Sequence, residues 1–215
     1  MLRDVLLWIQ AHPKTFLTTT QQHLALSAVA LAAVMAIGGP LGLFLTRWRS
    51  AANLAIGLAN VLRSIPSLAL LVIMLPVLGT GFLPSVVALT LYGLPAVLIN
   101  SYTAILAVDG DVVDAARGQG LSDGEVLRRI EIPLALPVIL AGIRTAAVQI
   151  VSAATLAVFI GGGGLGELIS AGMGLFDIPQ LLVGALAVAA LAILTEGLFG
   201  LVEFLLTRSS GARSP

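Results

Sequence analysis

The sequence predicts an all-α integral membrane protein with about five transmembrane helices. Hydrophobic residues make up 58% of the 215-residue chain and charged residues only 10%, and the mean hydropathy is +1.06. Soluble domains carry about a quarter charged residues, so a soluble enzyme is excluded. Eleven basic residues balance eleven acidic ones, which leaves no broad cationic surface for nucleic acid. The absence of cysteine excludes thiolate metal sites and cysteine nucleophiles.

Charge-free stretches place the membrane spans, because a helix rises about 1.5 Å per residue and needs about 20 apolar residues to cross the hydrocarbon core. The first such stretch ends at Arg47-Trp48-Arg49, a basic and aromatic sequence typical of a membrane interface. The 45 residues between Arg63 and Asp109 are also uncharged, which suits two spans. The predicted spans are 24–46, 52–79, 84–107, 137–160 and 181–206.

The second span is expected to be broken. Twenty-eight residues of helix would reach about 42 Å, which is long for one straight crossing and too short for two. Pro66 interrupts the hydrogen-bond ladder, so we expect a short interfacial helix over 51–65 and the crossing proper from about Ser67. Separate insertion of 51–65 would give six spans.

Lysine and arginine counts in the connecting segments predict the orientation. Seven arginines fall on one side of a five-span chain, whereas only Arg3 and Lys14 fall on the other. We therefore expect the N-terminus outside, with 1–23 as an amphipathic segment on the outer surface, and the tail 207–215 in the cytoplasm. The transmembrane domain is then 24–206. The seven arginines are Arg47, Arg49, Arg117, Arg128, Arg129, Arg208 and Arg213.

The one long polar segment, 109–136, is predicted to form two short helices on the cytoplasmic side. The first ends at glycines such as Gly120, and a capping-box pattern from Ser122 to Glu125 opens the second. Pro133 and Pro137 are expected to end it. A helix pair of this kind cannot bury itself, so its natural use is docking on a partner, although an ordinary solvated loop is the alternative.

The loop contains Asp-Ala-Ala, three residues, Gly, nine residues and Ile-x-Ile-Pro. This spacing resembles the EAA loop of permease subunits of bacterial binding-protein-dependent ABC importers, whose pattern has Glu at the first position and Leu before the proline. The resemblance, which runs over about 24–206, implies a type I importer permease in the bacterial inner membrane. It also implies a coupling helix that docks on a cytoplasmic ATPase, and a non-catalytic chain whose partner holds the ATP and magnesium. The coupling residues so implied are Asp114, Ala115, Ala116, Gly118, Gly120, Ile130, Ile132 and Pro133.

Two further segments, 141–149 and 161–169, resemble osmoprotectant permeases, which import glycine betaine, choline, carnitine or related quaternary ammonium compounds. The sequence at 63–66 also fits, but it is similar in methionine importers, so an amino-acid importer is the alternative. The resemblance implies an external binding protein that carries most of the selectivity, since two Trp and two Tyr are too few for an aromatic cage. A second permease, identical or paralogous, is needed because five helices enclose no adequate path.

Rival classes of function remain. A passive channel or a membrane assembly factor could use the polar loop to bind a protein other than an ATPase. An intramembrane enzyme is disfavoured because the catalytic motifs of such enzymes are absent. No metal site is expected.

A run of four glycines follows the fourth predicted span. It is not a phosphate loop, since no lysine follows it. Its position at the outer end of the span suggests either flexible backbone near an external gate or a simple turn. The residues of this glycine run are Gly161, Gly162, Gly163 and Gly164.

Polar residues inside the predicted spans supply the remaining candidates. Arg144 in the fourth span is expected to pair with Glu196 or Glu203 in the fifth, because charges inside a membrane are costly; snorkelling of the arginine to the headgroups is the alternative. Side chains that could line a pathway could equally form interhelical hydrogen bonds. These pathway candidates are Asn100, Gln149 and Thr155.

Overall fold

The computed structural model describes residues 2–209, and every regular element in that range is helical. In chain order the elements are α1 (Leu2–Ala11), α2 (Pro13–Leu45), α3 (Arg49–Ser64), α4 (Ser67–Leu78), α5 (Phe82–Leu106), α6 (Gly110–Gly118), α7 (Asp123–Val126), the π-helical turn η1 (Leu127–Glu131), α8 (Ile132–Ala153), the 3₁₀ helix η2 (Ala154–Ile160), α9 (Gly166–Leu175) and α10 (Ile178–Ser209).

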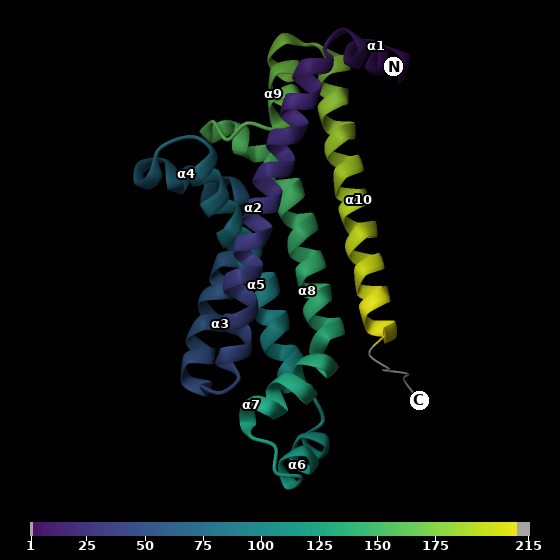
Figure 1. Ribbon diagram of the computed structural model, residues 1–215. Coiled ribbons are helices and arrows are strands. Elements are labelled where there is room, and N and C mark those ends of the chain that lie inside the picture. The colour runs from purple at the N-terminus through teal and green to yellow at the C-terminus, as the bar shows by residue number, and fades with distance from the viewer. Residues whose placement is uncertain (1, 210–215) are drawn as a thin grey trace.

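Four helical segments are long and apolar enough to cross a membrane, and a fifth span results if the bent pair of α3 and α4 is taken as one. These segments run side by side, with the first helix and the end of the last at opposite ends of the bundle (Figure 1). The loop with α6 and α7 lies at the same end as the end of α10, and α9 lies at the other end. The five-span fold class expected from the sequence is therefore confirmed.

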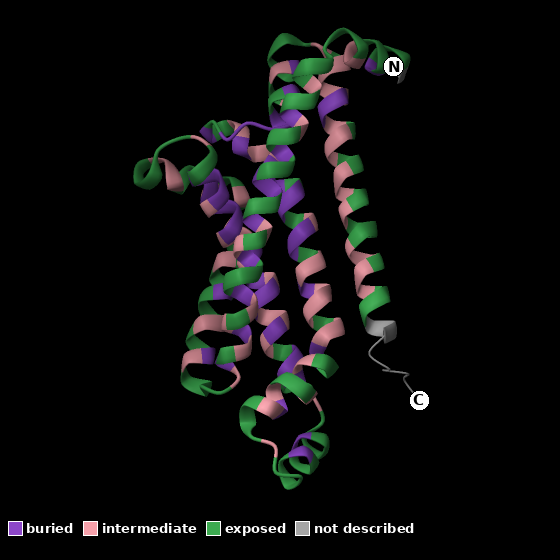
Figure 2. Cartoon of the chain, viewed as in Figure 1, coloured by how far each residue is buried: buried purple, intermediate pink, exposed green. Residues whose placement is uncertain are grey.

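The core lies where α2, α5 and α8 meet, and α5 contacts both neighbours extensively. Leu26, Leu89, Val97 and Ile150 are each almost fully buried there. Figure 2 shows buried residues along the facing sides of these helices and exposed residues along the outer side of α10. In a membrane such packing stabilises through van der Waals contact rather than through removal of apolar surface from water.

The second span is broken at Pro66, and α3 and α4 are long and apolar enough for a span only when taken together. The axes of α3 and α4 differ by 103°. With 12 residues, α4 reaches only about 18 Å, too short to cross, and it projects sideways from the bundle (Figure 1). Instead α3 lies along the bundle, because small Ala52 and Ala59 pack against Leu45 of α2 and Leu98 of α5. The expectation of an interfacial helix over 51–65 and a crossing from Ser67 was wrong.

Other boundaries also moved. α2 begins at Pro13 rather than at 24, so only α1 forms a separate N-terminal segment. Pro133 and Pro137 do not end the loop helix; the chain is helical from 123 to 160, and the π-helical turn η1 precedes Pro133. Turns of this type, and neighbouring helices in a membrane, accommodate the missing proline N–H. The helix α9 was not expected, and of the tail only 207–209 is described, as the end of α10.

Candidate functional site

The polar loop forms a small knob at the end of the bundle. Asp109 begins α6, and its Oδ1 accepts a hydrogen bond from the backbone N–H of Asp111 at 2.9 Å. Val113, Ala116 and Val126 form a miniature core that holds α6 against the following helix. The loop is therefore a folded unit rather than a loose connection.

The second loop helix projects beyond the membrane. The 22 residues of α8 alone reach about 33 Å, which already matches a hydrocarbon core of about 30 Å, and α7 and η1 come before them. Its first turn carries the expected capping box, in which Ser122 and Glu125 bond reciprocally. Backbone and side-chain hydrogen bonds from Ser122, followed by the positive charge of Arg129, lower the pKa of Glu125. The carboxylate is therefore held in its charged form at the positive end of this helix.

The residues implied by the EAA resemblance fall into two groups. Ala115 and Ile130 line a surface hollow of about 410 Å³ on the knob, together with Asp111, Val112, Ala116, Gln119 and Leu121. Gly120 has a φ of +88°, which glycine adopts at no steric cost, and it supplies the turn between the two helices. Asp114 and Gly118 are exposed on α6. Ile132 and Pro133 instead begin α8, where Ile132 packs against the membrane end of the bundle.

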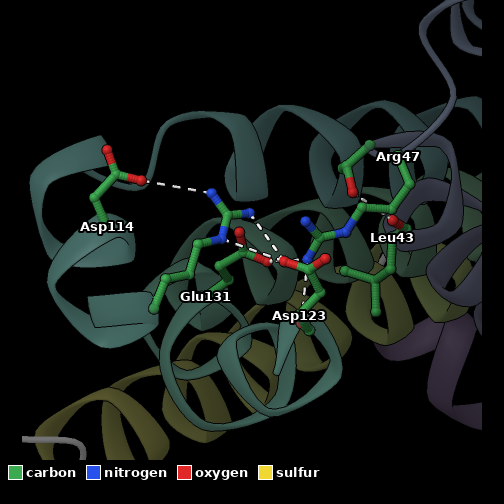
Figure 3. A network of polar contacts seen from close by, with 7 residues as sticks. Leu43, Arg47, Asp114, Asp123 and Glu131 are labelled. Atoms are coloured by element: carbon green, nitrogen blue, oxygen red, sulfur yellow. Dashed lines mark hydrogen bonds and ion pairs between the residues drawn. The ribbon is translucent and has the colours of Figure 1, made fainter. Parts of the chain in front are cut away.

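A polar network connects the knob to the first span (Figure 3). Arg117 contacts Asp114 at 3.5 Å and Asp123 at 3.2 Å, which joins α6 to α7. Arg47, just beyond the end of α2, contacts Glu131 at 2.9 Å, and the Glu131 side chain is only 8% exposed. The same guanidinium donates to the backbone oxygen of Asp123 at 3.5 Å. Sequence reasoning missed the contact between Arg47 and Glu131, because 84 residues separate them.

Arg144 lies between the two glutamates of α10. Its guanidinium contacts Glu196 and lies 3.3 Å from Glu203. Gly200 lies between these glutamates on α10, and the arginine runs close past it. The expected contact between the fourth and fifth spans is thus present, and both glutamates take part.

A groove with both polar and apolar side chains runs along α5 and α8 beside the helix break. Gln149 and Thr155 line its larger part, of about 480 Å³, together with Ser67, Tyr92, Val148, Ser152, Ala153 and Leu156. Asn100 lines an adjoining hollow of about 80 Å³, with Arg63, Tyr92, Pro95, Ala96, Ile99, Thr145 and Gln149. All three pathway candidates thus lie on one face, although Asn100 also donates to the backbone oxygen of Ala96 at 2.7 Å.

The glycine run ends η2 and turns the chain back into the bundle. Gly161 is exposed, and its φ of +74° terminates the 3₁₀ helix. Gly162 is buried, and its backbone N–H donates to the backbone oxygen of Ala157 at 2.9 Å. A side chain at Gly162 would clash with the hydroxyl of Ser85 on α5, so this position depends on close packing rather than on freedom of the backbone.

The second half of the glycine run is packed against α2. Gly163 and Gly164 are buried there, with φ of +79° and +96°. The backbone N–H of Gly164 donates to Oε1 of Gln22 at 3.1 Å, and next to it Nε2 of His23 lies 2.9 Å from the backbone oxygen of Val151. Three of the four glycines are therefore enclosed, which favours a turn over an open, flexible gate at Gly161 to Gly164.

Among the described residues there is no group of three or more potential side-chain ligands that could hold a metal ion.

A bundle of five spans with a folded knob at one end defines a multi-pass membrane protein. Residues 38–208 match the family of binding-protein-dependent transport system inner membrane components. The chain belongs to this family, and it is a multi-pass protein of the inner membrane.

Characterised relatives are similar over most of the chain. The glycine betaine/carnitine/choline transport system permease protein OpuCB of Bacillus subtilis (strain 168) is 37% identical over 202 residues, which cover 94% of this chain and 93% of the relative. The osmoprotectant import permease protein OsmW of Salmonella typhimurium is 40% identical over 193 residues, or 87% and 90% of the two chains. The carnitine transport permease protein OpuCB of Listeria monocytogenes is 38% identical, with 94% and 93% covered.

Solved structures agree on the fold. An inward-facing structure of the MetNI methionine ABC transporter superposes with a TM-score of 0.75 at 24% identity, covering 93% of this chain and 98% of that one. An amino acid ABC transporter crystallised with histidines gives a TM-score of 0.72 at 20% identity, covering 94% and 97%. At these identities the likeness shows the fold alone.

Proposed function

We propose that this chain is the permease subunit of an ATP-driven importer that moves an osmoprotectant such as glycine betaine, choline or carnitine across the inner membrane. An external binding protein delivers the substrate, and a separate cytoplasmic ATPase, which binds ATP and magnesium, docks on the knob. A second permease, either identical or a paralogue, completes the pathway within the membrane lipid. The chain itself is not an enzyme and carries no cofactor.

One observation carries this proposal: the folded knob, with exposed Asp114 and Ala115 on α6 and a hollow of about 410 Å³ beside them. A hollow lined by small and apolar side chains suits the close approach of a partner surface. The names of three similar permeases, all for osmoprotectants, support the choice of substrate class over the amino-acid alternative.

The orientation follows from the same assignment. A cytoplasmic ATPase on the knob places the knob and the end of α10 in the cytoplasm. The elements at the opposite end, α1 and α9, then lie outside. This agrees with the positive-inside rule, since Arg47, Arg117 and Arg129 lie at the knob end.

The proposal is tested in liposomes that contain this chain, its ATPase and its binding protein. Glycine betaine, choline, carnitine, methionine and histidine are added singly, and ATP hydrolysis and uptake are measured. The docking variant is Ala115→Trp, which fills the hollow, and its matched control is Ala107→Trp, an exposed residue just before the knob that does not line the hollow.

A quaternary ammonium compound is expected to stimulate both activities, with stimulation lost in Ala115→Trp and kept in Ala107→Trp. Stimulation by methionine instead would retain an importer and overturn the osmoprotectant assignment. An ATPase that never assembles with the chain, or uptake that continues without ATP, would contradict the importer and favour a passive channel.

A further inference from the structure

The helix break at 65–66 lies at membrane depth. Arg63, in the last turn of α3, is 14 residues beyond Arg49, so it lies about 21 Å along a helix that runs with the bundle. Because α3 begins in the basic and aromatic sequence Arg47-Trp48-Arg49, which is typical of a membrane interface, we infer that Arg63 lies within the hydrocarbon core of about 30 Å. Non-helical backbone at such depth is tolerated only where protein covers it or where it lines a water-filled cavity. The face around the break is therefore not a lipid-facing surface.

Arg63 lacks a visible counter-charge. It is exposed, and it makes no ion pair or hydrogen bond within the part of the chain that the structure describes. The residues that line the two adjoining hollows include no aspartate and no glutamate. A cation at membrane depth is costly without an anion, so the position calls for an anionic group that comes from outside this chain.

The neighbours of Arg63 have a complementary chemistry. Tyr92 and Gln149 line both the small hollow beside Arg63 and the groove of about 480 Å³ that continues along α8. A guanidinium binds a carboxylate through two parallel hydrogen bonds, whereas the face of an aromatic ring attracts a quaternary ammonium group. The groove also falls within the range of volumes that small ligands occupy.

We propose that Arg63 and Tyr92 form a binding site in the permease for a zwitterion that has both a carboxylate and a quaternary ammonium group. Arg63 binds the carboxylate, the ring of Tyr92 contacts the ammonium end, and Gln149 adds an amide at the junction of the two hollows. This inference rests on the proposed osmoprotectant function and deepens it. It also assigns part of the selectivity to the permease, whereas the resemblance implied that the external binding protein carries most of it. The site favours glycine betaine and carnitine over choline, which has no carboxylate.

The test uses the reconstituted complex with its binding protein, and it measures uptake of glycine betaine, carnitine and choline at saturating binding protein. Each uptake rate of a variant is divided by that of the unchanged complex for the same substrate, which cancels the preference of the binding protein. The variants are Arg63→Gln, its control Arg49→Gln at the other end of α3, and Tyr92→Leu with its conservative control Tyr92→Phe. Assembly with the ATPase is checked for each by size-exclusion chromatography.

In Arg63→Gln, uptake of glycine betaine and carnitine is expected to fall about tenfold or more, as for loss of a charged hydrogen bond. Choline uptake changes by less than about twofold, and Arg49→Gln leaves all three unchanged. Tyr92→Leu is expected to lower uptake of all three substrates by about fivefold. Tyr92→Phe, which keeps an aromatic ring, is expected to leave uptake unchanged. An equal loss of all three in Arg63→Gln would overturn the site and indicate a contact with the second permease, and no loss at all would also overturn it. If the unchanged complex imports none of the three, the proposed function fails first, and the site falls with it.

Discussion

The contact between Arg47 and Glu131 gives the sharpest stability prediction. The carboxylate of Glu131 is only 8% exposed, and the guanidinium of Arg47 is its ion-pair partner at 2.9 Å. Replacing Arg47 by methionine preserves the apolar length of the side chain but leaves a buried carboxylate without its cation. Replacing Glu131 by methionine as well removes both charges, so no unpaired charge remains buried. The two variants therefore separate the cost of an unpaired charge from the loss of packing.

The magnitude follows from the geometry. At an effective dielectric of about 20, two charges 2.9 Å apart attract by roughly 6 kcal/mol, most of which the desolvation of the carboxylate offsets. Breaking a buried pair by removing one partner costs about 3–5 kcal/mol. Because the Arg47 side chain is 33% exposed and water screens it, we expect the lower end, about 3 kcal/mol, for Arg47→Met. Arg47→Met with Glu131→Met is expected to lie within about 1 kcal/mol of the unchanged protein.

Thermal unfolding of the purified permease in detergent measures this difference. For a chain of this length, about 3 kcal/mol corresponds to a Tm lower by roughly 6–12 °C. Arg49→Met is the control, because Arg49 is exposed and makes no ion pair in the described part of the chain. A Tm of Arg47→Met within about 1 °C of the unchanged protein would refute the reasoning, as would a double variant that is as unstable as the single one.

Three other outcomes are expected. Arg144→Glu should reduce the yield of folded protein in the membrane, because the contacts of Arg144 join α8 to α10. Adding Glu196→Arg should partly restore the yield, and no recovery with the exchanged pair would count against the ion pair. Gly166→Ala should lower stability by about 3 kcal/mol, since the added Cβ would clash with the backbone oxygen of Thr155 in η2, whereas Gly174→Ala, in open space on the same helix, should not destabilise in the same Tm assay. Because the pKa of Glu125 is lowered, its carboxylate contributes to stability above pH 4.5, the ordinary pKa, and this contribution is lost as the pH falls through the depressed pKa. The Tm difference between the unchanged protein and Glu125→Gln should vanish over the same pH range. A Tm difference that persists at lower pH would show that the charge of Glu125 is not its cause.

Features that depend on local pattern were predictable from the sequence. The lengths of the uncharged stretches predicted the number of spans, and the spacing of Ser122 and Glu125 predicted the capping box. Few charges lie inside the spans, so the partners of Arg144 could be predicted as well. The break at Pro66 was also predictable, but the path of the chain around it was not. Hydropathy favoured α4 as the crossing, whereas in the structure α3 packs through small residues against α2 and α5, and α4 packs Leu70 and Leu71 into the main core.

Long-range polar contacts were beyond sequence reasoning. Glu131 looked like one more charge in a polar loop, and only the fold brings it against Arg47 at the far end of another helix. The same holds for Gln22 and His23, whose partners lie 142 and 128 residues away. A buried hydrogen bond of this kind leaves no periodic signal in a single sequence.

The positions of these contacts limit how the first span can move. One polar attachment, through Gln22 and His23, joins α2 to the segment of α8 and the glycines beyond it at the end away from the knob. The other, through Arg47 and Glu131, joins α2 to the same helical segment beside the knob. Attachments at two distant points oppose both sliding of α2 along α8 and rotation of one helix about the other. If a partner pushes on the knob, we expect α2 and α8 to tilt together, and α10 is tied to the same helix through Arg144. Relative motion then falls to α3 and α4, beyond the break at Pro66.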